Sequence, residues 1–144
     1  MTPQVVDRSL FAEIWPPCLA GSRCAECGTT AFPHQAGCPR CGSATSTVPL
    51  PRRGTVWSWT VQCYQPKPPY RAPAEGFSPY AVGYVDLGDV LVESRLEVPH
   101  DLLRIGLPVR LALVPAWQEE DGTETVTYAF VPDLSVLGLE EAAS

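Results

Sequence analysis

Two C-x-x-C pairs constrain this chain more than any other feature of its sequence. They are Cys24 with Cys27 and Cys38 with Cys41, separated by ten residues, and a glycine follows each pair. Thiolates are soft ligands that suit tetrahedral zinc, and two short turns at this spacing can present four sulfurs to one ion. A glycine allows the positive φ that such a turn often needs. Because four thiolates leave no open coordination position, the sequence predicts a structural Zn²⁺ bound by Cys24, Cys27, Cys38 and Cys41.

Disulfides are the alternative use of paired cysteines, and they require an oxidising compartment. The N-terminal sequence lacks a basic region followed by an apolar segment, and no apolar run approaches the roughly 18 residues of a membrane span. We therefore expect a cytoplasmic protein with reduced thiols and no membrane partner. Cys18 and Cys63 lie outside the two pairs. For Cys18 the sequence leaves open a packed apolar side chain or a surface thiol, and no histidine near it supports a catalytic role.

Composition favours a small protein made of turns and short strands. Its 144 residues suffice for one domain, or for a small module attached to a domain of about 100 residues. Sixteen prolines and eleven glycines disfavour long helices. The net charge of −6 opposes general nucleic-acid binding, because phosphate contacts dominate that affinity. One segment, 52–71, carries four basic residues and no acidic one, so it could meet a small polyanion.

The N-terminal segment 1–18 is predicted to contain a short amphipathic helix over residues 9–15. Ser9 can cap this helix, and Pro16 ends it. One face of the helix is apolar, formed by Leu10, Phe11, Ile14 and Trp15. A helix this short is not stable alone, so it must dock either on its own domain or on a partner protein. The four apolar residues are therefore candidates for partner docking.

Residues 19–48 are predicted to form a zinc ribbon, in which the metal turns belong to small β-hairpins. His34 lies between the two cysteine pairs and is expected to be a surface or neighbouring residue, since four cysteines already complete the ligand set. After the proline-marked linker 48–51, the pattern changes to alternating strands. In the first of these strands, the face carrying Trp57, Trp59 and Cys63 is predicted to point into the core.

Five strands are predicted beyond the linker, and their order matches an OB-fold barrel over residues 49–133. Their ranges are 54–64, 78–87, 90–96, 109–115 and 125–132, with a turn or short helix at 99–106. Residues 134–144 form a C-terminal tail. The fold class predicted from these elements is mainly β, with a short N-terminal helix, a rubredoxin-like zinc ribbon and a five-stranded OB-fold barrel.

Several motifs follow one another along the chain in a characteristic order. They are Cys24-x-x-Cys27-Gly28, Phe32-Pro33, Cys38-Pro39-x-Cys41-Gly42, Arg53-Gly54-Thr55-Val56-Trp57-Ser58-Trp59-Thr60, Pro79-Tyr80-Ala81-Val82-Gly83-Tyr84-Val85-Asp86-Leu87 and Leu103-Arg104-Ile105-Gly106-x-Pro108-Val109. From about residue 10 to 132 the chain resembles the DUF35 family of acyl-CoA-associated proteins, which join a rubredoxin-like zinc ribbon to an OB-fold.

This resemblance implies a non-catalytic subunit of a thiolase-superfamily or lipid-transfer-protein-like enzyme. Such a subunit helps to form the acyl-CoA site of its partner and supports thiolytic or retro-aldol cleavage of a CoA thioester, with the catalytic residues on the partner. The resemblance also suggests a heterotetramer with two copies of each subunit. Two alternatives are a subunit of a MaoC-type enoyl-CoA hydratase complex and a single-stranded nucleic-acid-binding OB-fold protein. The acidic charge opposes the nucleic-acid alternative.

The longest predicted loop, 65–77, joins the first two barrel strands, and OB-folds commonly bind ligands through this loop. Cations beside aromatic rings suit the phosphates and adenine of coenzyme A. The candidate CoA-binding residues are Arg52, Arg53, Lys67, Tyr70, Arg71 and Phe77. The alternative is that this loop mainly contacts the partner enzyme. The sequence contains no G-x-S-x-G, G-x-G-x-x-G, P-loop or H-E-x-x-H motif, which argues against a stand-alone enzyme.

Overall fold

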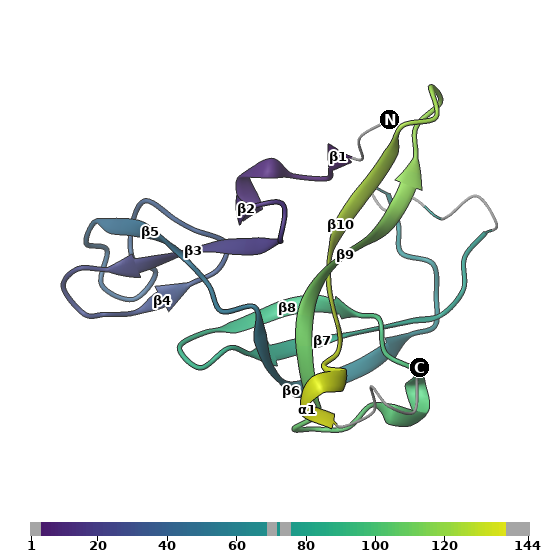
Figure 1. Cartoon of the computed structure of the whole chain (residues 1–144). Helices are drawn as coiled ribbons and strands as arrows, with labels where there is room; N and C mark the ends of the chain where they lie inside the picture. The colour runs from purple at the N-terminus through teal and green to yellow at the C-terminus, as the bar shows by residue number, and fades with distance from the viewer. Residues whose placement is uncertain (1–3, 69–71, 73–75, 138–144) are drawn as a thin grey trace.

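The computed structural model describes residues 4–68, 72 and 76–137. Its strands form two connected parts, a small four-stranded sheet and a larger barrel (Figure 1). In the small sheet, β3 (Cys18–Cys24) lies in the centre and pairs antiparallel with three short strands. These strands are β2 (Phe11–Glu13), β4 (Thr30–Ala31) and β5 (Thr45–Pro49). This small sheet is the ribbon that the cysteine spacing predicts.

Five strands close the barrel in the connectivity of an OB-fold. They are β6 (Arg53–Gln62), β7 (Tyr80–Asp86), β8 (Leu91–Leu96), β9 (Pro108–Gln118) and β10 (Glu124–Pro132). The order is β6-β7-β8-β10-β9, and β9 returns to pair with β6. The β8–β10 pair is parallel, while the other pairs of the barrel are antiparallel. The predicted fold class is therefore confirmed, because a five-stranded barrel in which the third strand pairs with the fifth has the connectivity of an OB-fold.

Short elements complete the chain around the barrel. β1 (Gln4–Val5) runs parallel to β10, and a 3-10 helix, η2 (His100–Leu102), connects β8 to β9 as predicted. After β10, the tail forms one turn of helix, α1 (Leu134–Leu137). No helix in the described part of the chain is long and apolar enough to cross a membrane.

The amphipathic helix predicted over residues 9–15 is wrong in extent and type. A 3-10 helix, η1 (Arg8–Leu10), is followed directly by β2, and the residue that caps it is Asp7, not Ser9. One carboxylate oxygen of Asp7 accepts hydrogen bonds from both the backbone N–H and the hydroxyl of Ser9, at 3.0 and 2.6 Å. The chain then extends because Phe11 pairs with Leu19 of β3. Tertiary pairing thus overrides a helical periodicity of only seven residues.

A β-bulge in β6 overturns the predicted core face of that strand in its first half. The register with β7 shifts between Val56 and Ser58, so the alternation changes parity there. Val56 is 1 % exposed, whereas Trp57 is 53 % exposed. After the bulge, Trp59 lies opposite Gly83. The odd-numbered residues in this half of β6 therefore lie on the same face of the sheet as the buried residues of β7 with which they pair. Even so, 39 % of the surface of Trp59 remains exposed, which places two tryptophans on the protein surface.

Gly83 is required at this bulge for steric reasons. A Cβ on Gly83 would lie 2.1 Å from the Ser58 carbonyl oxygen and 2.9 Å from the Cα of Trp59. Both neighbours are backbone atoms, so they cannot move without separating β6 from β7. A glycine therefore lets the two strands approach closely where the bulge bends β6.

The ribbon and the barrel share one hydrophobic core, which includes Phe11, Leu19 and Leu50 together with the barrel interior. Tyr128 of β10 lies at the junction, where its ring makes edge-to-face contacts with Phe11 and Phe32 at centroid distances of 6.5 and 5.8 Å. Burial raises the pKa of Tyr128 to about 12, with the Glu93 carboxylate adding to the effect. The ribbon is thus fixed to the barrel by packing as well as by the covalent linker.

Candidate metal centre and ligand-binding residues

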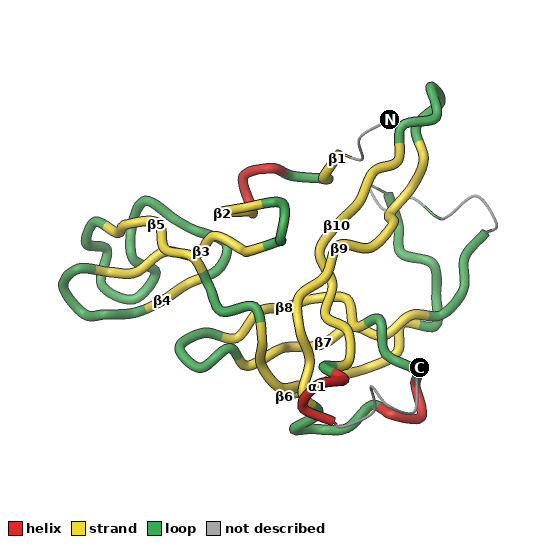
Figure 2. Tube along the Cα trace, viewed as in Figure 1, coloured by secondary structure: helices red, strands yellow, loops and turns green. Residues whose placement is uncertain are grey.

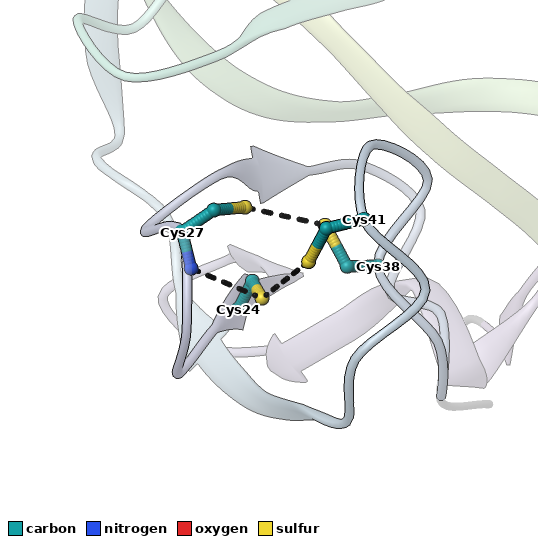
Figure 3. Close-up of side chains that lie close together, drawn as sticks. All are labelled: Cys24, Cys27, Cys38 and Cys41. Atoms are coloured by element: carbon teal, nitrogen blue, oxygen red, sulfur yellow. Dashed lines mark hydrogen bonds between the residues drawn. The ribbon is translucent and has the colours of Figure 1, made fainter.

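The four cysteines of the two pairs converge on one point at the end of the ribbon. Their sulfurs all lie within 4.8 Å of one another, and the closest pairs are Cys24–Cys41 at 3.4 Å and Cys27–Cys38 at 3.6 Å (Figure 3). A disulfide requires about 2.05 Å, so these contacts are not disulfides. Four sulfurs at about 2.3 Å from a tetrahedral zinc lie roughly 3.8 Å apart. The observed separations therefore fit a tetrathiolate metal site.

Each cysteine pair forms the same backbone turn. The N–H of Gly28 donates to the carbonyl of Cys24 at 3.0 Å, and the N–H of Gly42 donates to the carbonyl of Cys38 at 2.9 Å. Both glycines have positive φ, 75° and 80°, as the sequence predicts. The two turns thus position two sulfurs each, and their similarity explains why one short motif occurs twice.

Hydrogen bonds at two cysteines of the cluster favour thiolates, which are the form that binds a metal, whereas burial and the neighbouring thiols raise the pKa of Cys24 to about 11. The Thr29 hydroxyl lies 3.1 Å from the Cys27 sulfur, and its hydrogen bond lowers the pKa of Cys27 to about 6. A hydrogen bond from Ser43 lowers the pKa of Cys41 in the same way. The Cys38 sulfur also accepts the N–H of Arg40 at 3.3 Å.

His34 and the two cysteines outside the pairs lie away from this cluster. His34 is exposed, and its Nε2 lies 3.1 Å from the carbonyl oxygen of Ser9. Cys18 is buried in β3 with its sulfur 3.4 Å from the carbonyl oxygen of Leu50, so it is a packed side chain and not a surface thiol. Cys63 is exposed, contrary to its predicted place on the core face.

The structure does not gather the six candidate CoA-binding residues at one place. Arg52 and Arg53 lie at the start of β6, beside the ribbon, whereas Lys67 and Phe77 lie beyond its other end. A ten-residue strand spans roughly 30 Å. Figure 2 shows the described parts of the long connection between β6 and β7 on the side of the barrel away from the ribbon. Tyr70 and Arg71 lie outside the described residues.

Both arginines at the start of β6 also have carboxylate partners within the chain. Arg52 lies 3.5 Å from a Glu13 carboxylate oxygen, and its Nε donates to the carbonyl of Pro17 at 2.9 Å. Arg53 lies 3.3 Å from the carboxylate of Asp133, which is buried. A hydrogen bond from Ser135, together with Arg53, lowers the pKa of Asp133. These arginines therefore hold the N- and C-terminal segments to the barrel.

The four candidate docking residues of the N-terminal segment have different environments. Phe11 is buried in the core, and Leu10 and Ile14 pack against it. Trp15 is 62 % exposed. Of this set, Trp15 offers the largest free surface to a partner.

A tetrathiolate ribbon joined to an OB-fold barrel defines a known class of two-part protein, and comparisons with known proteins identify the family. Residues 19–47 match the family model described as "ChsH2, rubredoxin-like zinc ribbon domain". Residues 47–114 match the model described as "ChsH2, C-terminal OB-fold domain". The chain belongs to the DUF35 family.

Several relatives of known description match most of the chain. It is 32 % identical over 116 residues to "Benzoylsuccinyl-CoA thiolase subunit BbsA" of Thauera aromatica, covering 79 % of this chain and 76 % of the relative. It is 28 % identical over 120 residues to a "DUF35 domain-containing scaffold protein" of Methanocaldococcus jannaschii, covering 80 % and 82 %. Among solved structures, "Ltp2-ChsH2(DUF35) aldolase" matches with a TM-score of 0.61 and 28 % identity, covering 88 % of this chain and 96 % of that one.

Proposed function

We propose that this chain is the non-catalytic subunit of a heteromeric enzyme whose other subunit belongs to the thiolase superfamily. The observation that carries the proposal is the match over both modules to a benzoylsuccinyl-CoA thiolase subunit and to the DUF35 chain of an aldolase complex. In this proposal the partner supplies the catalytic residues for thiolytic or retro-aldol cleavage of a C–C bond in a CoA thioester. The assembly is a heterotetramer with two copies of each subunit.

The metal cluster has a structural role in this proposal. The cysteines would hold Zn²⁺, whose tetrahedral shell they fill completely, so the ion supplies cross-linking and no coordination position for a substrate. The ribbon strands are two to seven residues long, so they bury little apolar surface of their own. Metal binding would therefore stabilise the folded ribbon directly.

The proposed route to the acyl-CoA site is the connection between β6 and β7. Lys67 is exposed there, and Phe77 is half-buried with its ring 6.1 Å from that of Tyr80. A cation beside aromatic side chains suits a phosphorylated nucleotide. Arg52 and Arg53 are weaker candidates, because Glu13 and Asp133 already neutralise them.

Affinity capture from the native host tests the proposed function. The chain is tagged at its C-terminus, captured under low salt and analysed by mass spectrometry. We expect a thiolase-superfamily protein to bind in equal amounts and to show acyl-CoA cleavage only as the complex. Capture of an enoyl-CoA hydratase would favour the MaoC-type alternative. A thiolase-superfamily subunit with the same solubility and activity in the absence of this chain would contradict the proposal.

Substitution of Lys67 and Arg71 together by alanine tests the CoA-binding role of the loop. We expect the purified complex to bind acyl-CoA at least about tenfold more weakly, since each lost charged hydrogen bond is worth roughly 1.5–3 kcal/mol. Arg104→Ala is a matched control, because Arg104 is an exposed cation outside this loop. Unchanged acyl-CoA affinity in the double variant, with an intact complex, would remove the loop from the ligand site.

A further inference from the structure

A groove crosses the outer face of β7 and β8 where the ribbon meets the barrel. Its volume is about 500 Å³, and its lining comes from both parts of the protein. Phe32 belongs to the ribbon, whereas Tyr84, Glu93 and Tyr128 belong to the barrel. A second hollow of about 320 Å³ shares Tyr84 and Glu93 with the first and extends it toward β6. We call the combined feature, lined by Phe32, Tyr84, Glu93 and Tyr128, the aromatic groove.

Aromatic side chains form the walls of the aromatic groove along its length. At the ribbon end, Phe32 contacts the ring of Tyr128, whose hydroxyl donates to the carbonyl oxygen of Glu93 at 2.9 Å. At the β6 end, Trp59 and Tyr84 line the groove, and Trp57 lies beside this lining, edge-to-face with Tyr84 at a centroid distance of 6.3 Å. Trp57 is 53 % exposed and Tyr84 is 41 % exposed, so a large aromatic surface faces solvent here. Such residues are enriched among those that dominate binding at protein interfaces.

One open carboxylate lies in the middle of these walls. Glu93 is exposed, and among the described residues its carboxylate has no ion-pair partner and only a 3.4 Å contact from the Tyr84 hydroxyl. Arg95, on the same face of β8, also lines the groove, and its guanidinium is held by an ion pair and a ring contact, although its buried Nε makes no hydrogen bond of good geometry. Its Nε lies 2.7 Å from a Glu97 carboxylate oxygen, and its guanidinium lies 4.6 Å from the centre of the Tyr80 ring. The open charge in the groove is therefore negative.

An exposed carboxylate in a groove lined by tyrosines attracts a cation, because aromatic rings nearby can add a cation–π contact to the ion pair. The same arrangement repels phosphates, so the groove suits neither coenzyme A nor nucleic acid. The walls derive from β6, β7, β8 and β10, and three strand spacings amount to roughly 15 Å. That length accommodates about five residues of an extended chain. An aromatic wall of this length with a central acid fits an apolar peptide segment that carries one basic residue.

From this geometry we infer that the aromatic groove binds an extended segment of the partner enzyme and receives an arginine or lysine side chain of that segment at Glu93. The inference rests on the proposed function, since the partner is the thiolase-superfamily subunit. The inference also links the metal centre to binding of the partner enzyme. Phe32 lies in the chain between the two cysteine pairs, so the metal-stabilised ribbon would hold one wall of the groove in place.

The test uses the complex with the captured thiolase-superfamily subunit and compares three charge variants. Glu93→Gln removes the charge, and Glu93→Lys reverses it. Glu120→Lys is the matched control, because Glu120 is exposed in the turn between β9 and β10. We expect the dissociation constant, measured by calorimetry at low salt, to rise about tenfold for Glu93→Gln and at least a hundredfold for Glu93→Lys, as for a close interfacial ion pair. The control should bind like the wild type.

A second measurement does not depend on charge. Benzoylphenylalanine in place of Leu91, which also lines the groove, should cross-link to a basic segment of the partner, whereas the same probe at Glu120 should not. Substitution of the cross-linked basic residue of the partner by glutamate should restore binding between the partner and the Glu93→Lys variant. Wild-type affinity of a folded, zinc-loaded Glu93→Lys variant would overturn the groove while leaving the proposed function intact. Failure of the wild-type chain to bind any thiolase-superfamily subunit would overturn both.

Discussion

Tyr128 connects the ribbon to the barrel. Replacing it by phenylalanine separates the contribution of its hydroxyl to stability from the contribution of its ring. The change keeps the edge-to-face contacts with Phe11 and Phe32 but removes the hydrogen bond to the Glu93 carbonyl oxygen. A typical hydrogen bond contributes about 1 kcal/mol net. At pH 7 we therefore expect the free energy of unfolding to fall by about 1 kcal/mol.

The free energy of unfolding at alkaline pH gives a sharper test, because the pKa of Tyr128 is raised to about 12. In the unfolded chain a tyrosine titrates near pH 10, so the folded state holds the proton more tightly. The stability from this protonation is complete below pH 10 and is lost as the pH rises toward 12. Two pKa units correspond to about 2.7 kcal/mol, and about half of this is lost by pH 11. The Tyr128→Phe variant lacks that loss, so it should become the more stable protein near pH 11.

Urea unfolding followed by circular dichroism at pH 7, 9 and 11 measures both effects. Tyr64→Phe serves as the control, because the Tyr64 side chain is 82 % exposed, and this variant should follow the wild type throughout. Comparing variants removes the contribution of the other titrating groups. An unchanged difference between wild type and Tyr128→Phe from pH 7 to pH 11 would refute a half-buried tyrosine at the junction that holds its proton more tightly in the folded state.

Three further predictions concern the metal, the C-terminal segment and the bulge. Cys41→Ser should reduce the zinc content, measured by plasma emission spectrometry, from one ion per chain to much less. It should also lower both solubility and partner binding. A variant that stays folded and partner-bound without zinc would contradict the structural role. Asp133→Asn should cost about 1–2 kcal/mol at pH 7 in urea unfolding. Because the pKa of Asp133 is lowered, this difference should be complete above the unfolded value near 3.9 and should be lost progressively as the pH falls through the lower pKa of the folded state. A difference that stays constant from pH 7 to pH 3 would exclude a carboxylate held ionised by Ser135 and Arg53. Gly83→Ala should cost about 3 kcal/mol by thermal unfolding, since its methyl group would meet the Ser58 carbonyl oxygen, and wild-type stability would show that the bulge can relax.

The features predicted correctly from the sequence are those that depend on local pattern. The spacing of the cysteine pairs and the glycines that follow them predicted the cluster of four cysteines, because each C-x-x-C turn closes within five residues. The five barrel strands were predicted to within a few residues, since alternating apolar residues and Gly88 at the β7–β8 turn are local signals. Their order along the chain then restricted the topology to an OB-fold.

The errors came from features that depend on contacts between distant segments. The segment 9–15 carries helical periodicity, yet its pairing with β3 makes it a strand after one 3-10 turn. The bulge at Trp57 changes which face of β6 is buried. No residue of β6 predicts this bulge, because Gly83, which lets the two strands approach there, lies on the neighbouring strand. The groove was missed for the same reason: Phe32, Glu93 and Tyr128 lie far apart in the sequence.

By itself, the sequence determined the four cysteines that cluster as candidate metal ligands, the strand order and the family resemblance, because these follow from the spacing of neighbouring residues. Only the tertiary structure decided which surfaces are free. It buried Phe11, exposed Trp57 and engaged Arg52 and Arg53 with carboxylates from other segments. It also placed the open carboxylate of Glu93 between aromatic walls from two parts of the chain. Exposure and charge pairing depend on what packs nearby, and strand register and ribbon docking set that arrangement in three dimensions.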